Sequence, residues 1–184
     1  VGEAINILNQ GGKVLIFSCF KNSCEALFNS MQAYLRGGLR GYEGDDHSNI
    51  AAAGYKVVQI TDKSKGSKGV QQAVDGFKGI IRERNGKITE DPDSLVKVMI
   101  VSALKGGTGI SLENTTEHVL INDFDWMPAV CQQVEGRAYR INNIFPVNTR
   151  YMVVRGSGVD ENGKRVISPD EKFIAFRIMK RAEG

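Results

Sequence analysis

The segment Gln132–Arg140, QQVEGRAYR, contains three side chains that could hold a polyanion. On a helix, Arg137 and Arg140 are three residues apart and Gln133 precedes Arg137 by four, so all three share one face. Two guanidinium groups beside an amide suit phosphate, because the planar fork of arginine matches the geometry of phosphate oxygens. Two arginines alone are more typical of a solvated helix face with Glu135 as partner, so the hypothesis needs support from other segments.

A glycine-rich segment, Ser102–Leu112 (SALKGGTGISL), follows an apolar run. Gly106, Gly107 and Gly109 would let the backbone approach a ligand closely, and backbone amides in such loops can cradle phosphate. The segment is not a P-loop, because GxxxxGK[ST] is absent from the whole chain, and it does not contain the dinucleotide fingerprint GxGxxG. Taken by itself, the segment favours a tight turn.

Two carboxylates follow another apolar run, in the segment Asp123–Pro128, DFDWMP. On an extended strand Asp123 and Asp125 would point the same way and could hold a metal ion. The alternative is that they cap the helix that Pro128 opens, since negative charge is favourable at a helix N-terminus. The absence of a Walker A motif favours the capping interpretation.

Five short apolar runs predict the strands that must position these segments. The runs are Lys13–Ser18, Tyr55–Ile60, Val96–Val101, Val119–Ile121 and Tyr151–Val154. Apolar residues at helical spacing lie between them, and Pro128 begins a predicted helix that reaches about Tyr139. Short apolar strands that alternate with helices predict an α/β fold with a mainly parallel central sheet flanked by helices. Ligands of such folds bind at the carboxyl ends of the strands, so we expect sites just after Ser18, Ile60, Ser102 and Asp123.

Three further segments complete the predicted layout. Arg36–Gly54 is glycine-rich and polar and is interpreted as a loop or insertion, and Arg84–Asp93 as a polar connection. Ser168 and Pro169 predict the cap and first turn of a last helix over 169–182, with an apolar face that includes Phe173 and Phe176. We therefore expect one folding unit over residues 1–184.

Composition narrows the class of protein. The 184 residues carry a net charge of +3, which by itself does not establish a nucleic-acid partner, although Thr61–Lys68 contains three lysines and one aspartate. The cysteines Cys19, Cys24 and Cys131 form no CxxC pair, which indicates reduced structural thiols in an intracellular protein, without metal. No apolar run approaches the roughly 18 residues of a membrane span, so no membrane partner is expected. Because the sequence starts at Val1, we expect a segment of a longer protein.

Taken together and in this order, the segments resemble the second RecA-like lobe of superfamily 2 helicases, in particular the SWI/SNF-like DNA-dependent ATPases. The likeness covers roughly residues 13–154. KVLIFS resembles motif IV, VMIVSALKGGTGISL resembles motif V, and QQVEGRAYRIN resembles motif VI, for which the family typically has QxxxRAHRIGQ. DFDWMP resembles the family's DxxWNP link. The implied fold is a three-layer RecA-like lobe.

The resemblance implies a role for each motif. Arg137 and Arg140 would be arginine fingers on the γ-phosphate of ATP, with Gln133, Gly107 and Gly109 beside the nucleotide. Trp126 and Asp123 would couple hydrolysis to DNA movement. The DNA backbone would be contacted by five residues, which are Ser102, Lys105, Thr61, Lys63 and Lys65. Contacts of this kind are independent of sequence and sensitive to salt.

The implied partners are double-stranded DNA and an N-terminal RecA-like lobe of the same protein, which would bind most of the ATP and Mg²⁺. This chain alone is then expected to be inactive. Its location would be nuclear in a eukaryote, and cytoplasmic or at the nucleoid in a prokaryote or virus. Departures from the family pattern, such as Lys105 in place of alanine and Ser111 and Met127 in place of asparagine, indicate a divergent relative. The alternatives are a strand-separating helicase lobe and a non-catalytic nucleic-acid-binding module.

Overall fold

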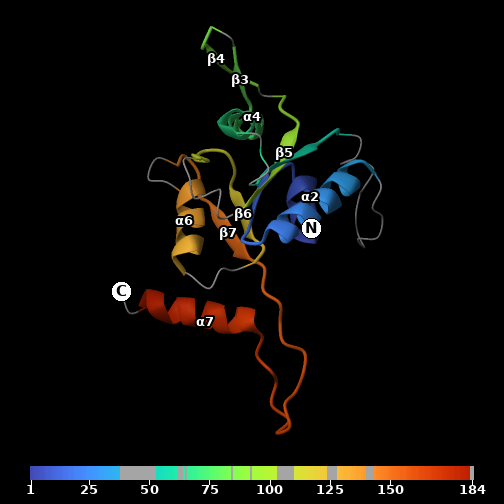
Figure 1. Cartoon of the computed structure of the whole chain (residues 1–184), viewed down its shortest axis with the longest axis vertical. Helices are drawn as coiled ribbons and strands as arrows, with labels where there is room; N and C mark the ends of the chain where they lie inside the picture. The colour runs from blue at the N-terminus through green and yellow to red at the C-terminus, as the bar shows by residue number, and fades with distance from the viewer. Residues whose placement is uncertain are drawn as a thin grey trace.

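A five-stranded parallel sheet forms the centre of the computed structural model, which describes residues 1–37, 53–61, 64, 66–83, 85–91, 93–102, 110–123, 128–139 and 143–182. The strand order is β2-β5-β1-β6-β7 (Figure 1). The strands are β1 (Val14–Ser18), β2 (Lys56–Ile60), β5 (Val96–Ser102), β6 (His118–Ile121) and β7 (Asn148–Tyr151). All four pairings are parallel, as the alternation of strands and helices predicts.

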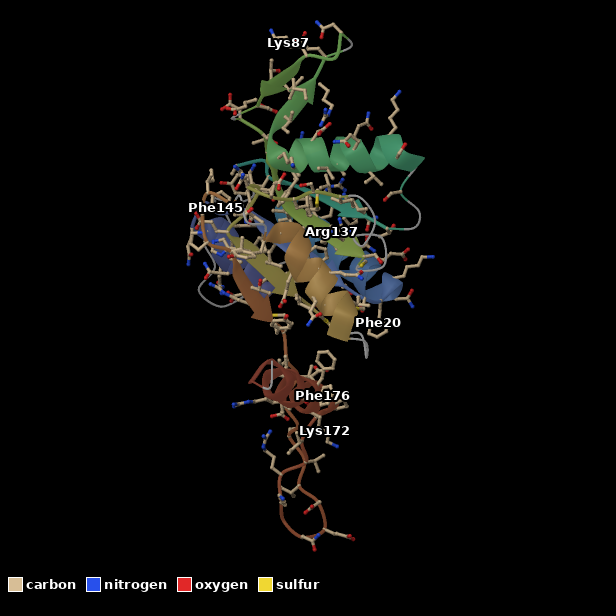
Figure 2. All side chains as sticks on the ribbon, turned by 90° about the vertical axis from the view of Figure 1, so that its left-hand side faces the viewer. Phe20, Lys87, Arg137, Phe145, Lys172 and Phe176 are labelled. Carbon is tan, nitrogen blue, oxygen red and sulfur yellow. The ribbon has the colours of Figure 1, made fainter. Side chains whose placement is uncertain are left out.

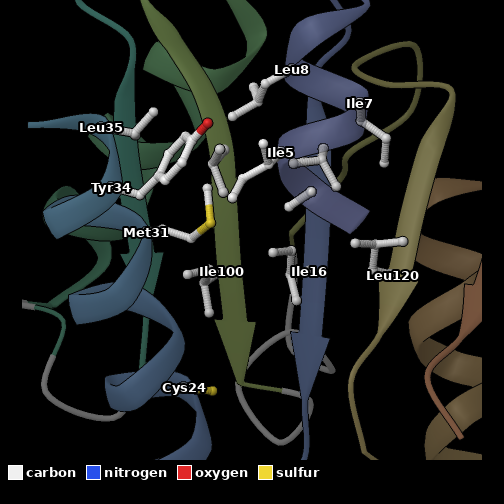
Figure 3. Close-up of a cluster of buried hydrophobic side chains, with 13 residues drawn as sticks. Ile5, Ile7, Leu8, Ile16, Cys24, Met31, Tyr34, Leu35, Ile100 and Leu120 are labelled. Carbon is white, nitrogen blue, oxygen red and sulfur yellow. The ribbon is translucent and has the colours of Figure 1, made fainter. Parts of the chain in front are cut away.

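Successive side chains of the strands point to opposite faces of the sheet and create two separate cores. On one face, Ile16 and Ile100 pack against α1 (Gly2–Asn9) and α2 (Lys21–Leu35), as Figure 3 shows. On the other face, Phe17 and Val101 pack with Phe77 of α4 (Gly66–Lys78) and with residues of α6 (Pro128–Ala138). The molecule is therefore an α/β fold of three layers, which matches a RecA-like lobe and confirms the predicted fold class.

The predicted fifth strand is displaced by three residues. The apolar run Tyr151–Val154 suggests a strand, but β7 is Asn148–Tyr151, and its first residue pairs with His118. β7 is an edge strand with alternating burial, so only one of its faces contributes to a core and a polar sequence is tolerated there. Val153 and Val154 instead lie in the exposed segment that follows.

A β-hairpin occupies part of the segment that the sequence predicts as a polar connection, Arg84–Asp93. Strands β3 (Ile80–Arg82) and β4 (Ile88–Glu90) pair antiparallel and project beyond α4, away from the central sheet (Figure 1). The turn contains Asn85 and Gly86, a dipeptide typical of tight hairpins. The prediction is wrong because it weighed the polarity of this segment and overlooked the turn signal between two apolar-containing triplets.

The chain leaves β7 through a long extended loop and ends in α7 (Pro169–Ala182), which lies below the sheet in Figure 1. The cap predicted for this helix is confirmed, because the Ser168 hydroxyl accepts the Glu171 amide at 3.1 Å. Glu171 reciprocates by accepting the Ser168 amide at 2.9 Å, which completes a capping box. Phe173 is nearly buried, whereas Phe176 is 47% exposed, so part of the predicted apolar face is uncovered. No described helix is both long and apolar enough to cross a membrane.

The predicted insertion at 36–54 lies largely outside the described residues. The structure shows that α2 ends at Leu35, close to the predicted boundary, and that the chain is described again from residue 53. The helix begins at Lys21, and Phe20 occupies the N-cap position.

Candidate functional site at the carboxyl edge of the sheet

The carboxyl ends of the parallel strands meet at one edge of the sheet, as the sequence predicts. Ser18 at the end of β1 lies in register with Ser102 at the end of β5. Thr61 follows β2, whose last residue pairs with the neighbouring strand β5, and Asp123 follows β6 by two residues. Four segments that are far apart in the sequence are thereby brought to the same edge.

Asp123 joins the ends of two neighbouring strands at this edge. Its carboxylate accepts hydrogen bonds from the Ser18 hydroxyl and from the backbone amide of Cys19, and also from the side-chain amide of Asn122 at 3.1 Å. The Cys19 thiol in turn donates to the Asp123 carbonyl, at 3.7 Å. The carboxylate thus holds the turn between β1 and α2. Residues 124–127, which connect Asp123 to Pro128, lie outside the described part of the chain, so the expected capping of the helix stays a prediction.

The cysteine near this turn is buried and chemically quiet. The Cys24 thiol donates to the Ser18 carbonyl at 3.7 Å, and its pKa is raised, chiefly because burial disfavours the thiolate. A raised pKa keeps the thiol protonated at neutral pH. Cys24 therefore packs as a small apolar residue and fixes the first turn of α2 against β1.

Helix α6 carries the predicted phosphate-binding face next to the glycine-rich segment. The Arg137 carbonyl accepts the Leu112 amide at 3.3 Å, which ties the end of α6 to the residues that follow the glycines. Gln133 is exposed and Arg137 is half-buried. Glu135, which the sequence offers as a partner for the arginines, accepts a hydrogen bond from the Tyr151 hydroxyl. The carboxylate therefore also links α6 to the edge strand β7.

A cleft of about 570 Å³ opens beside the end of β2 and extends along α4. Hydroxyl groups of Thr61, Ser64 and Ser67 line one part of it, and Lys78 and Arg82 line another. Ile110 and Ser111, near the end of the glycine-rich segment, also line the cleft. The remaining lining residues are Ile60, Gly66, Val70, Gln71 and Val74. The cleft joins two of the segments that the sequence assigns to DNA contact, and its hydroxyl and cationic groups are those that bind phosphate.

The structure describes some of the predicted site residues and leaves others outside the described part of the chain. Thr61 is buried but lines the cleft, while Ser102 is 5% exposed and lies outside the cleft lining. Seven predicted residues lie outside the described part of the chain, namely Arg140, Gly107, Gly109, Lys105, Lys63, Lys65 and Trp126. For these seven residues the roles stay predictions.

The sequence analysis does not predict the ion pair between Asp75 of α4 and Arg82 of the hairpin, which brings Arg82 to the cleft. Asp75, which is only 7% exposed, accepts the Arg82 Nε–H at 2.6 Å and the Gln71 amide at 2.7 Å. The spacing of Gln71 and Asp75, four residues apart on a helix, was a visible signal for one of these bonds. Arg82 gave no such signal, because its approach to Asp75 depends on the hairpin reversing the chain after α4.

Known proteins with similar sequences are ATP-dependent helicases and remodelers. CHR12 of Arabidopsis thaliana, described as a probable ATP-dependent DNA helicase, is 36% identical over 87 residues, which is 46% of this chain and 8% of CHR12. CHR23 of the same plant, with the same description, is 34% identical over 87 residues. The chromatin structure-remodeling complex subunit snf21 of Schizosaccharomyces pombe is 33% identical over 75 residues, which is 41% of this chain and 6% of snf21.

Over part of its length this chain is similar to SWI/SNF-like helicases. The C-terminal part of the Fun30 ATPase domain has the same fold, with a TM-score of 0.56 over 98% of this chain and 51% of that one, at 20% identity. The matched segment spans less than a tenth of each of these three helicase relatives, and no family model matches the chain. The predicted resemblance to the C-terminal lobe of this helicase class is thus confirmed.

Proposed function

We propose that this helicase-like lobe is the C-terminal half of an ATP-driven translocase on double-stranded DNA. One observation carries the proposal: the hydrogen bond from the Leu112 amide to the Arg137 carbonyl joins the segment assigned to DNA contact to the helix assigned to ATP contact. A motor needs such a link, because DNA movement must be coupled to the state of the nucleotide. The ATP dependence in the names of CHR12 and CHR23 supports the proposal.

On the nucleotide side, Arg137 and Arg140 would reach across to ATP bound by an N-terminal RecA-like lobe, with Gln133, Gly107 and Gly109 beside it. Guanidinium groups stabilise the charge of a transferring phosphoryl group and can be worth about 10³–10⁵ in rate. Among the described residues, no group of three His, Cys, Asp or Glu side chains is arranged to hold a metal ion. Mg²⁺, which neutralises phosphate charge when bound, would be held mainly by the N-terminal lobe, as the resemblance implies.

On the DNA side, the cleft along α4 would receive the sugar-phosphate backbone. Thr61 would contact it from the cleft wall, together with Lys63, Lys65, Lys105 and Ser102 from the neighbouring strand ends. The hydroxyl-rich part of the cleft supports this assignment, because hydroxyl and ammonium groups donate to phosphate oxygens without reading bases. Binding is then independent of sequence and weakens as salt increases.

Asp123 and Trp126 would carry the coupling between the two ligands. The hydrogen bonds of Asp123 to Ser18 and Cys19 link the chain after β6 to the end of β1 and to the turn before α2. A displacement of α6 during hydrolysis would then reach the β1 edge through the segment 122–128 that precedes the helix. In a eukaryotic cell, a motor of this kind on DNA works in the nucleus.

The test is DNA-stimulated ATP hydrolysis by the full-length protein that contains this chain. Arg137→Ala and Arg140→Ala should each lower kcat by at least 10³-fold, because the fingers act on the transition state, and leave duplex binding within about twofold. Gln132→Ala, an exposed neighbour on α6, is the matched control and should retain hydrolysis. Normal hydrolysis in both arginine variants would exclude the finger assignment, and ordinary ATPase turnover by residues 1–184 alone would exclude the two-lobe assignment.

Two alternatives are separated by assays on the same protein. Displacement of a labelled strand, with a rate that follows ATP hydrolysis, would identify a strand-separating helicase in place of a translocase. Duplex binding without any DNA-stimulated hydrolysis would identify a non-catalytic binding module. Translocation on an intact duplex, measured by ATP-dependent displacement of a triplex-forming oligonucleotide, is the result that we expect.

A further inference from the structure

The β3–β4 hairpin is anchored on α4 from its base. Gly79, at the end of the helix, has a φ of +75°, and a Cβ there would lie 2.8 Å from the Asp91 carbonyl oxygen. The Asp91 amide donates to the Gly79 carbonyl at 2.7 Å, and the Ser94 hydroxyl donates to the Gly76 carbonyl at 2.6 Å. An isolated two-stranded hairpin is marginally stable in water, so these contacts fix the direction in which this one projects.

A buried carboxylate also fixes the hairpin from its side. Asp75 accepts the Arg82 Nε–H at 2.6 Å, and this bond raises the pKa of the Arg82 guanidinium. A guanidinium has five N–H donors, so four remain beyond the one given to Asp75. The side chain of Arg82 is 45% exposed and lines the cleft, which leaves these donors accessible in a preset orientation.

Arg82 lines the same cleft as the hydroxyl-bearing residues Thr61 and Ser64 after β2. Lys78 in the last turn of α4 lines the same cleft, as does Ser67 in the first turn. Ser67 and Lys78 are separated by eleven steps of the helix, which corresponds to about 16 Å at roughly 1.5 Å per residue. The cleft is therefore long enough to contact more than one phosphate of a strand.

The segment before α6 also contributes a hydroxyl-bearing residue, Ser111, to the lining of the cleft. The Ser111 hydroxyl oxygen is buried and has no hydrogen-bond partner within the described part of the chain. The donors therefore come from three separate elements, and all of them suit an anion.

We propose that Lys78 and Arg82 extend the DNA-contacting surface from the carboxyl edge of the sheet along α4 onto the β3–β4 hairpin, where they hold backbone phosphates of the same duplex. This inference rests on the proposed function, because it continues the path that begins at Thr61. The hairpin tip carries Lys87, which Figure 2 shows at the far end of the hairpin and which is not among the residues that line the cleft.

The experiment measures equilibrium binding of the full-length protein to a labelled 30-base-pair duplex between 50 and 200 mM salt. Lys78→Gln and Arg82→Gln should each reduce the slope of log K against log salt by about 1, and the double variant by about 2, with an affinity loss that is independent of sequence. Lys87→Gln removes the same charge from the same hairpin and should keep the slope and the affinity of the wild type.

The outcomes distinguish this inference from the function on which it rests. If the wild type binds duplex and shows DNA-stimulated hydrolysis, but the double variant keeps its slope and affinity, the hairpin inference is wrong and the proposed function stands. If the wild type does not bind duplex, both are wrong. Arg82→Gln leaves Asp75 without its cationic partner, so the folded state of this variant must be checked by thermal unfolding. If that variant does not fold, Lys78→Gln alone tests the inference, because Lys78 is not part of the ion pair between Asp75 and Arg82.

Discussion

Different interactions stabilise the central lobe of this chain and its C-terminal extension, residues 152–182. Strand β1 of the lobe is buried along its whole length, and apolar side chains cover both faces of the sheet. In the extension, Val154 is 71% and Val159 is 70% exposed. Among the described side chains of the extension, only Ser168 and Phe173 are buried.

Polar contacts replace the missing core in the extension. Glu171 accepts three hydrogen bonds, from the Ser168 amide at 2.9 Å, the Gly156 amide at 3.1 Å and the Arg165 guanidinium at 2.8 Å. Gly156 also approaches the chain so closely that a Cβ would overlap the Val166 carbonyl oxygen. The lobe is therefore stabilised by burial and the extension by one carboxylate at a helix start, so the two regions should respond differently to the same change.

Removing a phenyl ring from each region should give the largest difference between them in lost free energy of unfolding. Phe77 is fully buried between α4 and the sheet, so Phe77→Ala should lower the free energy of unfolding by about 3–5 kcal/mol through lost burial and the cavity left behind. Phe176 on α7 is 47% exposed, so Phe176→Ala should cost less than about 1 kcal/mol. Chemical denaturation of both variants measures the difference, and equal losses would show that α7 belongs to the same cooperative core.

Removing an aspartate should give a smaller contrast. Asp123→Ala leaves the Ser18 hydroxyl and the Cys19 amide without their acceptor in a half-buried turn, so we expect a loss of about 1.5–3 kcal/mol in the free energy of unfolding. Asp160→Ala is the matched control, because Asp160 accepts two backbone amides in the exposed turn of the extension. This variant should lower the free energy of unfolding by less than about 0.5 kcal/mol. If the control loses as much as Asp123→Ala, the strand-end role assigned to Asp123 is wrong.

The smallest effect should be a local response of the extension to pH. Hydrogen bonds from the Ser168 and Gly156 amides, and then Arg165, lower the pKa of Glu171 to about 2 from its ordinary 4.5. A carboxyl group with a depressed pKa stabilises the fold above its ordinary pKa, and this contribution is lost as the pH falls from about 4.5 through about 2. Amide exchange at Gly156 and Ser168 should then become faster, while exchange in β1 stays slow.

Glu171→Gln should produce the same local loss of protection already at neutral pH, because the charged acceptor is gone. Glu161→Gln, at the exposed tip of the same loop, should leave the exchange of Gly156 and Ser168 unchanged. If β1 loses protection together with the extension in Glu171→Gln, the two regions unfold as one unit and the comparison fails.

The sequence predicts the parts of this fold whose signals are local. Four of the five predicted strands match the structure to within one residue. Three of them, β1, β5 and β6, are central strands, for which a short apolar run is typical because both faces are covered. The fourth, β2, is an edge strand whose valines still mark it as a strand. The Ser168 cap is predicted correctly because the capping contacts involve residues three apart. The fifth strand is predicted three residues too late, because one face of an edge strand can be polar and the apolar signal is then weak. The apolar residues that follow it, Val153 and Val154, lie in the extension.

The candidate site divides in the same way. Residue types and spacing along the chain determined the α/β class, the face shared by Gln133 and Arg137, and the strand ends at which ligands should bind. Only the tertiary structure decided that Asp123 accepts from Ser18 and Cys19, more than a hundred residues earlier in the chain, and that Arg82 faces the cleft through Asp75. Hydrogen-bond partners across such distances depend on strand order and on the direction of a hairpin, which periodicity along one segment does not specify.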